Sequence, residues 1–213
     1  MALGLLLTSA VSWMVASTPA AVEFVFSSKL VFYGLMLAQL GLVFGLTMGA
    51  QRLSRGQVLA GFFAYSGLMG VTLASIFLIY TMSSIGQLFL VASGMFGGMA
   101  LLGTVTKRDL TSMGSFLMMG VWGLILVGLV NIFVASEALN LALAAVTVLI
   151  FTGLTAYDAQ RIKHMAYISV TGSLSPEESA MADKGAVFAA LGLYLNFINL
   201  FLSLLRLFGS RRD

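Results

Sequence analysis

Residues 185–208 read GAVFAALGLYLNFINLFLSLLRLF, an apolar run long enough to cross a lipid bilayer. Inside this run lie Asn196, Asn199 and Arg206. Each amide or charge costs free energy in hydrocarbon unless a protein group or water satisfies it. A helix that faced only lipid would not hold three such groups. We therefore expect this last helix to be enclosed by the others.

The composition of the whole chain points to a membrane protein. The 213 residues are 60% hydrophobic and 9% charged, with a mean hydropathy of +1.03, whereas a soluble chain carries roughly 25% charged residues. The class is all-α and polytopic. The absence of cysteine excludes disulfides, thiol catalysis and Cys-based metal sites. The net charge of +3 comes without a basic patch among aromatic residues, so we expect no nucleic-acid partner.

Seven apolar segments divide the chain, with no separate soluble module between them. We expect one transmembrane domain over residues 1–213, with the lipid bilayer as its surroundings. The first segment lacks the basic start of a signal peptide, so we take it as a span. The predicted spans are residues 2–17, 30–48, 57–80, 85–106, 113–134, 139–160 and 185–208.

The basic residues of the loops set the expected orientation, because short cytoplasmic loops are rich in Lys and Arg. With the N-terminus inside, the inner loops hold Arg52, Arg55, Lys107, Arg108, Arg161, Lys163 and Lys184. The outside then holds Lys29, Arg206, Arg211 and Arg212. This majority favours a cytoplasmic N-terminus. With seven full crossings the basic tail lies outside, which the charge rule disfavours. Either the late charges are outvoted, or the last segment turns back without crossing, and we prefer the full crossing.

Small residues predict where helices pack closely. Gly41, Gly45 and Gly49 share one face of the second span, and Gly94 with Gly98 repeats the spacing in the fourth. Such faces let helix backbones approach in lipid. We favour contacts inside the molecule over a dimer interface.

The longest connection, residues 161–184, contains a helix-start signal. Ser175 is followed by Pro176 and, three residues after the serine, by Glu178, which is a capping-box pattern with proline at the first helical position. We expect a helix to begin there and continue into the last span. The linker then shrinks to about residues 165–174.

The sequence offers little for catalysis. His164 is the only histidine, which disfavours a zinc site or a Ser–His hydrolase. No GxSxG and no GxxxxGK[ST] motif is present. We therefore expect a protein that is not an enzyme and that holds no cofactor, calcium being the one candidate ligand.

Asp158 is the only acidic residue well inside an apolar segment. An intramembrane carboxylate costs roughly 2.5–3.5 kcal/mol if it is unpaired at mid-bilayer, so it suggests a functional site. Arg161, one turn further along, could neutralise it locally. Alternatively, Asp158 reaches Asn196 on the last span, with Asn199 one turn beyond. A carboxylate beside amide oxygens could bind calcium weakly, and it could equally be a hydrogen-bonded latch that closes a pore.

Three stretches resemble the Bax inhibitor-1 family, particularly its bacterial members. They are TAYDAQRIK at residues 155–163, LGLYLNFINLFLSLLRLFG at 191–209 and GLVFGLTMGAQRLSRG at 41–56. The resemblance implies six helices around a central seventh, in the inner membrane, and a pH-sensitive calcium leak. It also implies a proton-sharing aspartate pair on the last two spans. Asp158 matches the first aspartate, whereas Asn196 replaces the second.

The replacement changes what the resemblance implies. An Asp–Asn pair does not titrate as a coupled unit, so a latch here should respond to pH less steeply, or at lower pH, than an aspartate pair would, and it should attract calcium more weakly. The family also implies an arginine latch on the aspartate, for which Arg52 is the first candidate and Arg55 the second.

The favoured function is a passive calcium or cation leak gated near Asp158 and Asn196. The rival is a membrane regulator that binds a protease or stress-response partner. We find neither the inverted repeats nor the substrate-binding polar residues of a proton-coupled carrier.

Overall fold

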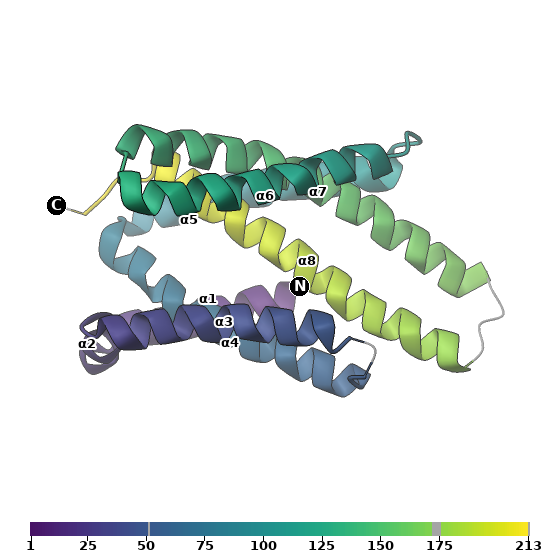
Figure 1. The fold of residues 1–213 in the computed structure, drawn as a ribbon, viewed down its shortest axis with the longest axis horizontal. Coiled ribbons are helices and arrows are strands. Elements are labelled where there is room, and N and C mark those ends of the chain that lie inside the picture. Colours follow the sequence, from purple (N-terminus) through teal and green to yellow (C-terminus); the bar gives the residue numbers. More distant parts are fainter. Residues whose placement is uncertain (51, 172–175, 213) are drawn as a thin grey trace. The chain divides into compact units, whose positions relative to one another are not determined.

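The computed structural model describes residues 1–50, 52–171 and 176–212, and for residues 168–171 and 176–180 it describes the backbone alone. The regular elements of this part of the chain are helices (Figure 1). They are α1 (Ala2–Ala16), α2 (Pro19–Phe26), α3 (Lys29–Met48), α4 (Arg55–Ile79), α5 (Met82–Val105), α6 (Thr111–Val134), α7 (Glu137–Thr171) and α8 (Pro176–Phe208).

The predicted polytopic α-helical class is confirmed. Six helices, α3 to α8, are long and apolar enough to cross a membrane, and the bent pair of α1 and α2 makes a seventh if it counts as one span. With 15 residues, α1 is about 22 Å long, which is less than a hydrocarbon core of roughly 30 Å. Thr18 is extended and Pro19 opens α2, so the chain bends by 99° there.

The predicted spans from α3 to α6 end within three residues of the observed helices. The last two helices are longer than the apolar segments. Residues 161–171 contain neither glycine nor proline, so α7 continues eleven residues past the predicted end at Gln160. The expected linker from residue 165 onwards is therefore largely helix. The predicted start of α8 at Pro176 is confirmed, whereas Ser175 lies outside the described residues and the side chain of Glu178 outside the described side chains.

Contacts divide the chain into two compact units. Unit 1 contains Met1–Tyr80, Ser173–Tyr194 and Arg212–Asp213, and unit 2 contains Thr81–Gly172 and Leu195–Arg211. Helix α8 thus contributes its first part to unit 1 and its second part to unit 2. The expectation of a single domain over residues 1–213 stays a prediction.

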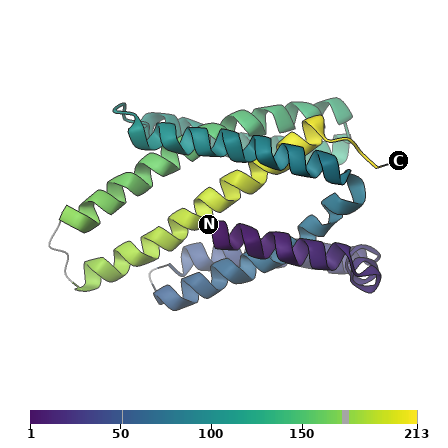
Figure 2. The ribbon, with the colours of Figure 1, turned by 180° about the vertical axis from the view of Figure 1, so that it is seen from behind.

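In unit 1, α1 packs on α4 through residues with small side chains (Figure 2). Each helix presents such residues at intervals of four. They are Gly4, Thr8 and Ser12 on α1, and Ser66, Gly70 and Ala74 on α4. A Cβ atom added to Gly70 would lie 2.7 Å from the Thr8 carbonyl oxygen. The two backbones approach closely because these side chains are small.

The predicted packing role is wrong for four of the five glycines singled out from the sequence, whereas a Cβ atom at the fifth, Gly49, would lie 3.0 Å from the Leu53 side chain in the turn after α3. A Cβ atom at Gly41, Gly45, Gly94 or Gly98 would meet no atom of the described residues within 4 Å. The orientation of α3 explains the first two. Gln39 donates to the Thr72 hydroxyl at 2.6 Å and turns that face of α3 toward α4, so the glycines face away.

In unit 2, α7 packs against both α5 and α6, and the three helices run side by side (Figure 1). Glycines lie at the closest points. Gly103 of α5 faces the Ala156 backbone, and Gly114 of α6 faces the Tyr157 ring. α7 is therefore fixed from two sides at the level of Asp158.

The tail after α8 lies at the end of α4 where that helix meets α5. In unit 1 the Arg212 N–H donates to the Ile79 carbonyl at 2.8 Å, and in unit 2 the Thr81 N–H donates to the Ser210 carbonyl at 3.0 Å. The Ser210 N–H donates to the Ser84 hydroxyl at 3.0 Å. α8 is continuous to Phe208 and is long and apolar enough to span a membrane, whereas the side of the membrane on which the tail lies stays a prediction.

Candidate functional site

Asp158 and Asn196 meet in unit 2. The Asn196 side-chain amide donates a hydrogen bond of 2.7 Å to the Asp158 Oδ2 atom. Both residues lie in candidate membrane spans, and only 5% of Asn196 is exposed. A hydrogen bond to a charged group is shorter and stronger than one between neutral groups. The predicted contact between the last two spans is therefore present.

Aromatic packing fixes the rotation of α8 in unit 2. Phe197 and Phe201 both contact Phe89 of α5, with ring centroids 5.4 and 5.8 Å apart. Phe96 contacts Phe197 from the next turns of α5, at 5.6 Å. These edge-to-face contacts hold one side of α8 on α5. The adjacent side, which carries Asn196, then faces α7.

Asn199 lies one turn beyond Asn196 but does not reach Asp158. Its side-chain N–H group donates to the Leu195 carbonyl at 2.9 Å, in its own helix. The amide oxygen of Asn199 accepts no hydrogen bond from the described residues. It is therefore a second free amide oxygen near the contact, beside that of Asn196.

The second half of α7 forms hydrogen bonds with the end of α5 and with the connection between α5 and α6. The Gln160 side chain accepts from the Leu110 N–H at 2.9 Å and donates to the Arg108 carbonyl at 2.8 Å. Lys163 donates to the Thr104 carbonyl at 2.6 Å. The first of these contacts is made by Gln160, two residues after Asp158 in the sequence. Sequence reasoning missed it, although a polar Gln160 at the end of an apolar segment was a signal.

Asp109 stabilises the same connection outside the membrane spans. Its carboxylate accepts from the Thr111 hydroxyl at 2.6 Å and from the Thr111 N–H at 2.9 Å. These two hydrogen bonds lower the pKa of the Asp109 carboxyl below its ordinary value. The charged form of Asp109 therefore favours the folded start of α6.

The predicted arginine latches on Asp158 are replaced by another pairing. Arg55 binds Asp183 of α8 at 2.6 Å, within unit 1, and this is the one ion pair in the described part of the chain. Arg55 is the first residue of α4 and thus reaches the early turns of α8. Arg52 and Arg161 are exposed, and neither forms an ion pair with a described residue.

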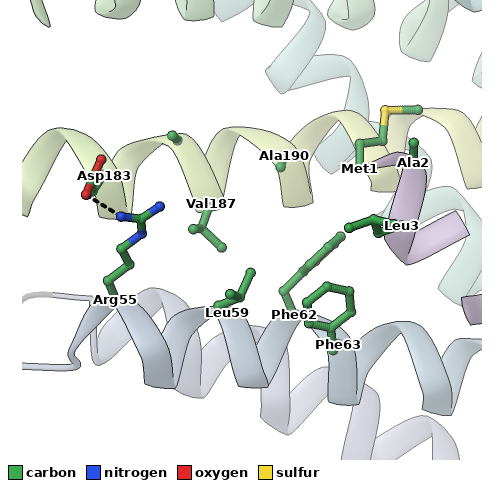
Figure 3. A pocket seen from close by; sticks show the side chains of 11 residues that line it. Met1, Ala2, Leu3, Arg55, Leu59, Phe62, Phe63, Asp183, Val187 and Ala190 are labelled. Carbon is green, nitrogen blue, oxygen red and sulfur yellow. Dashed lines mark hydrogen bonds and ion pairs between the residues drawn. The ribbon is translucent and has the colours of Figure 1, made fainter.

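The Arg55–Asp183 pair borders a cavity of about 390 Å³ in unit 1. Figure 3 shows the two charged side chains facing each other, with Leu59 and Val187 beside them and Phe62 further along α4. Apart from the ion pair, the side chains that line this cavity are apolar.

A second polar contact holds the earlier part of α8 in unit 1. The Tyr194 hydroxyl lies 2.7 Å from the Thr8 hydroxyl, and Tyr194 is fully buried. The Thr8 hydroxyl also donates to the Ser66 carbonyl, at 2.9 Å. The sequence analysis did not single out Tyr194 or Thr8. Each of these two residues places a hydroxyl group inside an apolar segment, and that could have marked it as needing a polar partner.

A weak calcium site at Asp158 and Asn196 stays a prediction. Calcium takes six to eight oxygen ligands. Asp158 and Asn196 bring one negative charge, and the described residues hold no group of three or more His, Asp or Glu residues that could bind a metal.

A family model described as inhibitor of apoptosis-promoting Bax1 matches residues 1–213. The chain belongs to the Bax inhibitor-1 family. It is 45% identical to inner membrane protein YbhL of Escherichia coli over 212 residues, which are 100% of this chain and 88% of that protein. An uncharacterized protein of Borreliella burgdorferi is 41% identical over 213 residues, covering 100% and 89%. An uncharacterized membrane protein of Streptococcus pyogenes is 36% identical over 183 residues, covering 86% and 76%.

Family membership and the apolar spans agree on the location. The chain is a multi-pass protein of the bacterial inner membrane. The family resemblance stated from the last two spans is thus confirmed over the whole chain.

Proposed function

We propose that this member of the Bax inhibitor-1 family is a passive, pH-sensitive leak for calcium and other cations across the inner membrane. The contact between Asp158 and Asn196 keeps the leak closed. When that contact opens, the carboxylate is freed to attract a cation. The proposal includes the arrangement of six helices around α8, and it requires neither catalysis nor a bound cofactor.

The observation that supports the proposal is the 2.7 Å hydrogen bond between the two side chains inside membrane spans. A carboxylate is costly in a membrane, and such groups mark ion pathways or proton relays more often than they serve packing. Asp158 has no ion-pair partner among the described residues. The carboxylate therefore accepts a hydrogen bond from a neutral amide and forms no ion pair with a described residue, and a cation can displace the amide.

Calcium flux into vesicles tests the leak. Purified protein is reconstituted into lipid vesicles, and calcium entry is followed with a trapped dye between about pH 5 and pH 8. We expect entry well above that of empty vesicles, with a shallow dependence on pH. Entry equal to that of empty vesicles over this whole range would contradict the leak.

The rival function is a regulator that binds a membrane protease or stress-response partner. It is favoured by the lack of a cluster of three or more metal-binding residues in the part of the chain that the structure describes. Mild-detergent purification from native membranes separates the two proposals. A stoichiometric protease partner together with absent calcium flux would favour the regulator.

A further inference from the structure

The side of α8 that carries Asn196 stays polar toward the outer end of the helix. Successive residues of a helix are about 100° apart, so Asn199 lies about 60° and Ser203 about 20° from Asn196 around the axis. The neighbouring positions of the same turns are Leu200, Leu204 and Leu205, all of them buried. Leu200 lies about 40° from Asn196 in the opposite direction. A strip about 60° wide, from Asn196 to Asn199, therefore carries amide and hydroxyl groups through the second half of the span.

Ser203 differs from three other buried hydroxyl residues of the helices. Thr8, Ser66 and Thr155 each donate to the carbonyl four residues earlier in their own helix. The Ser203 hydroxyl forms no hydrogen bond with the described residues, although the residue is only 6% exposed. Its oxygen is not fully enclosed, unlike those of Ser12 and Thr152, the two enclosed side-chain oxygens that lack a partner among the described residues. The Ser203 hydroxyl therefore keeps surface that water or an ion can reach, and an unpartnered hydroxyl in a span calls for such a ligand.

The depth of these groups matches a continuous path. A helix rises about 1.5 Å per residue, so Asn199 lies about 4.5 Å and Ser203 about 10 Å beyond Asn196 along α8. Free oxygens thus follow one another outward from the Asp158 carboxylate, first on Asn199 and then on Ser203. This spacing suits a cation that exchanges water for protein oxygens step by step.

We infer that Asn199 and Ser203 line the outer half of the passage, as the side of α8 that water and a partly hydrated cation contact. The inference rests on the proposed leak, whose outer route it assigns. Asp158 and Asn196 close the passage, and the two residues beyond them set its polarity.

Cysteine accessibility tests this assignment without measuring flux, because the native chain contains no cysteine. The Ser203→Cys variant is reconstituted, and its reaction with a small, charged, water-soluble thiosulfonate added from outside is timed. The matched control is Leu204→Cys, the next residue, which is 4% exposed against 6% for Ser203. Asn199→Cys and Leu200→Cys form a second pair in case one variant does not fold.

We expect the polar-side variants to react about tenfold faster than their controls, because water enters beside a polar group far more readily than beside leucine. Equal rates within both pairs, or no reaction at all four positions, would overturn the assignment. Faster reaction at Ser203 in a protein that passes no calcium would support the water-lined side and contradict the leak. The two failures are therefore distinguishable.

Discussion

The amide of Asn196 gives the site its chemical character. It donates to Asp158 at 2.7 Å and leaves its own oxygen free. Two carboxylates at this distance would have to share a proton and titrate together. With an amide in the second position, a single carboxylate takes up one proton, whereas a pair of carboxylates takes up two in separate steps.

The Asn196→Asp variant tests this view. A second carboxylate would share a proton with Asp158, so the calcium leak should respond to pH in two steps, one of them at higher pH than in the wild type. The measurement is vesicle flux at closely spaced pH values. Asn199→Asp is the matched control, since Asn199 bonds within its own helix. This variant should leave the pH profile of the calcium leak nearer that of the wild type. Identical profiles for wild type and Asn196→Asp would show that Asn196 is not the second gate position.

Asp109→Asn tests the start of α6. The pKa of the Asp109 carboxyl is lowered in the folded protein by bonds from Thr111, so its stabilising effect is present above the ordinary aspartate pKa of about 3.9 and fades as pH falls below it. Thermal unfolding in detergent should show a lower midpoint for the variant at pH 7. The gap to the wild type should narrow at about pH 3. A gap that is constant or wider in acid would contradict this role.

At the scale of elements, close helix contacts depend on which glycines face a neighbour. Gly70 lies against the Thr8 carbonyl of α1, whereas Gly67, one turn earlier on the same helix, would meet no described atom within 4 Å if it carried a Cβ. Residue type alone does not separate these two positions, because both are glycine. The rotation of α4 separates them, since it turns one of them toward α1.

Gly70→Ala and Gly67→Ala form a matched pair. The added methyl at position 70 meets a backbone carbonyl 2.7 Å away, so we expect a loss of about 1–3 kcal/mol in unfolding free energy. At position 67 the same change should be neutral or gain up to about 1 kcal/mol from helix propensity. Denaturant unfolding in detergent measures both. Equal effects at the two positions would contradict the packing of α1 on α4.

The ion pair between α4 and α8 should contribute little to stability. Arg55 and Asp183 expose 64% and 48% of their side chains, and exposed pairs are worth about 0–1 kcal/mol. Arg55→Ala and Asp183→Ala should each cost less than about 1 kcal/mol, and the coupling between them should weaken in salt. A double-mutant cycle at low and high salt checks this. A salt-independent coupling above about 2 kcal/mol would show a buried and stronger interaction.

At the scale of the whole molecule, the apolar segments predicted the six long helices α3 to α8 and their order, whereas the first predicted span is a short helix bent against α2. Composition decides this, since lipid leaves helices as the only spanning option for such a chain. The Asp158–Asn196 contact was also predictable, because a carboxylate and an amide in apolar runs need partners. Three features could not be predicted because they depend on how each helix is rotated and on the path of each loop. They are the Arg55–Asp183 pair, the glycines that contact a neighbouring helix and the hydrogen bonds of Gln160. A single sequence does not encode those visibly.

The account as a whole depends on one contact between the second part of α8 and α7. If the Asp158–Asn196 contact closes the passage, breaking it should raise the calcium flux. The rise should occur only in proteins that keep the Asp158 carboxylate. A cycle of Asn196→Leu, Asp158→Asn and the double variant separates these roles, because interacting residues show non-additive effects.

Calcium flux through these four proteins in matched vesicles is the most direct measurement. We expect Asn196→Leu to raise the flux about tenfold or more, since it removes a hydrogen bond to a charged group worth about 1.5–3 kcal/mol. We expect Asp158→Asn to lower the flux and to abolish the effect of Asn196→Leu in the double variant. An equal rise from Asn196→Leu with and without the Asp158 carboxylate, or no flux in any of the four, would contradict the account.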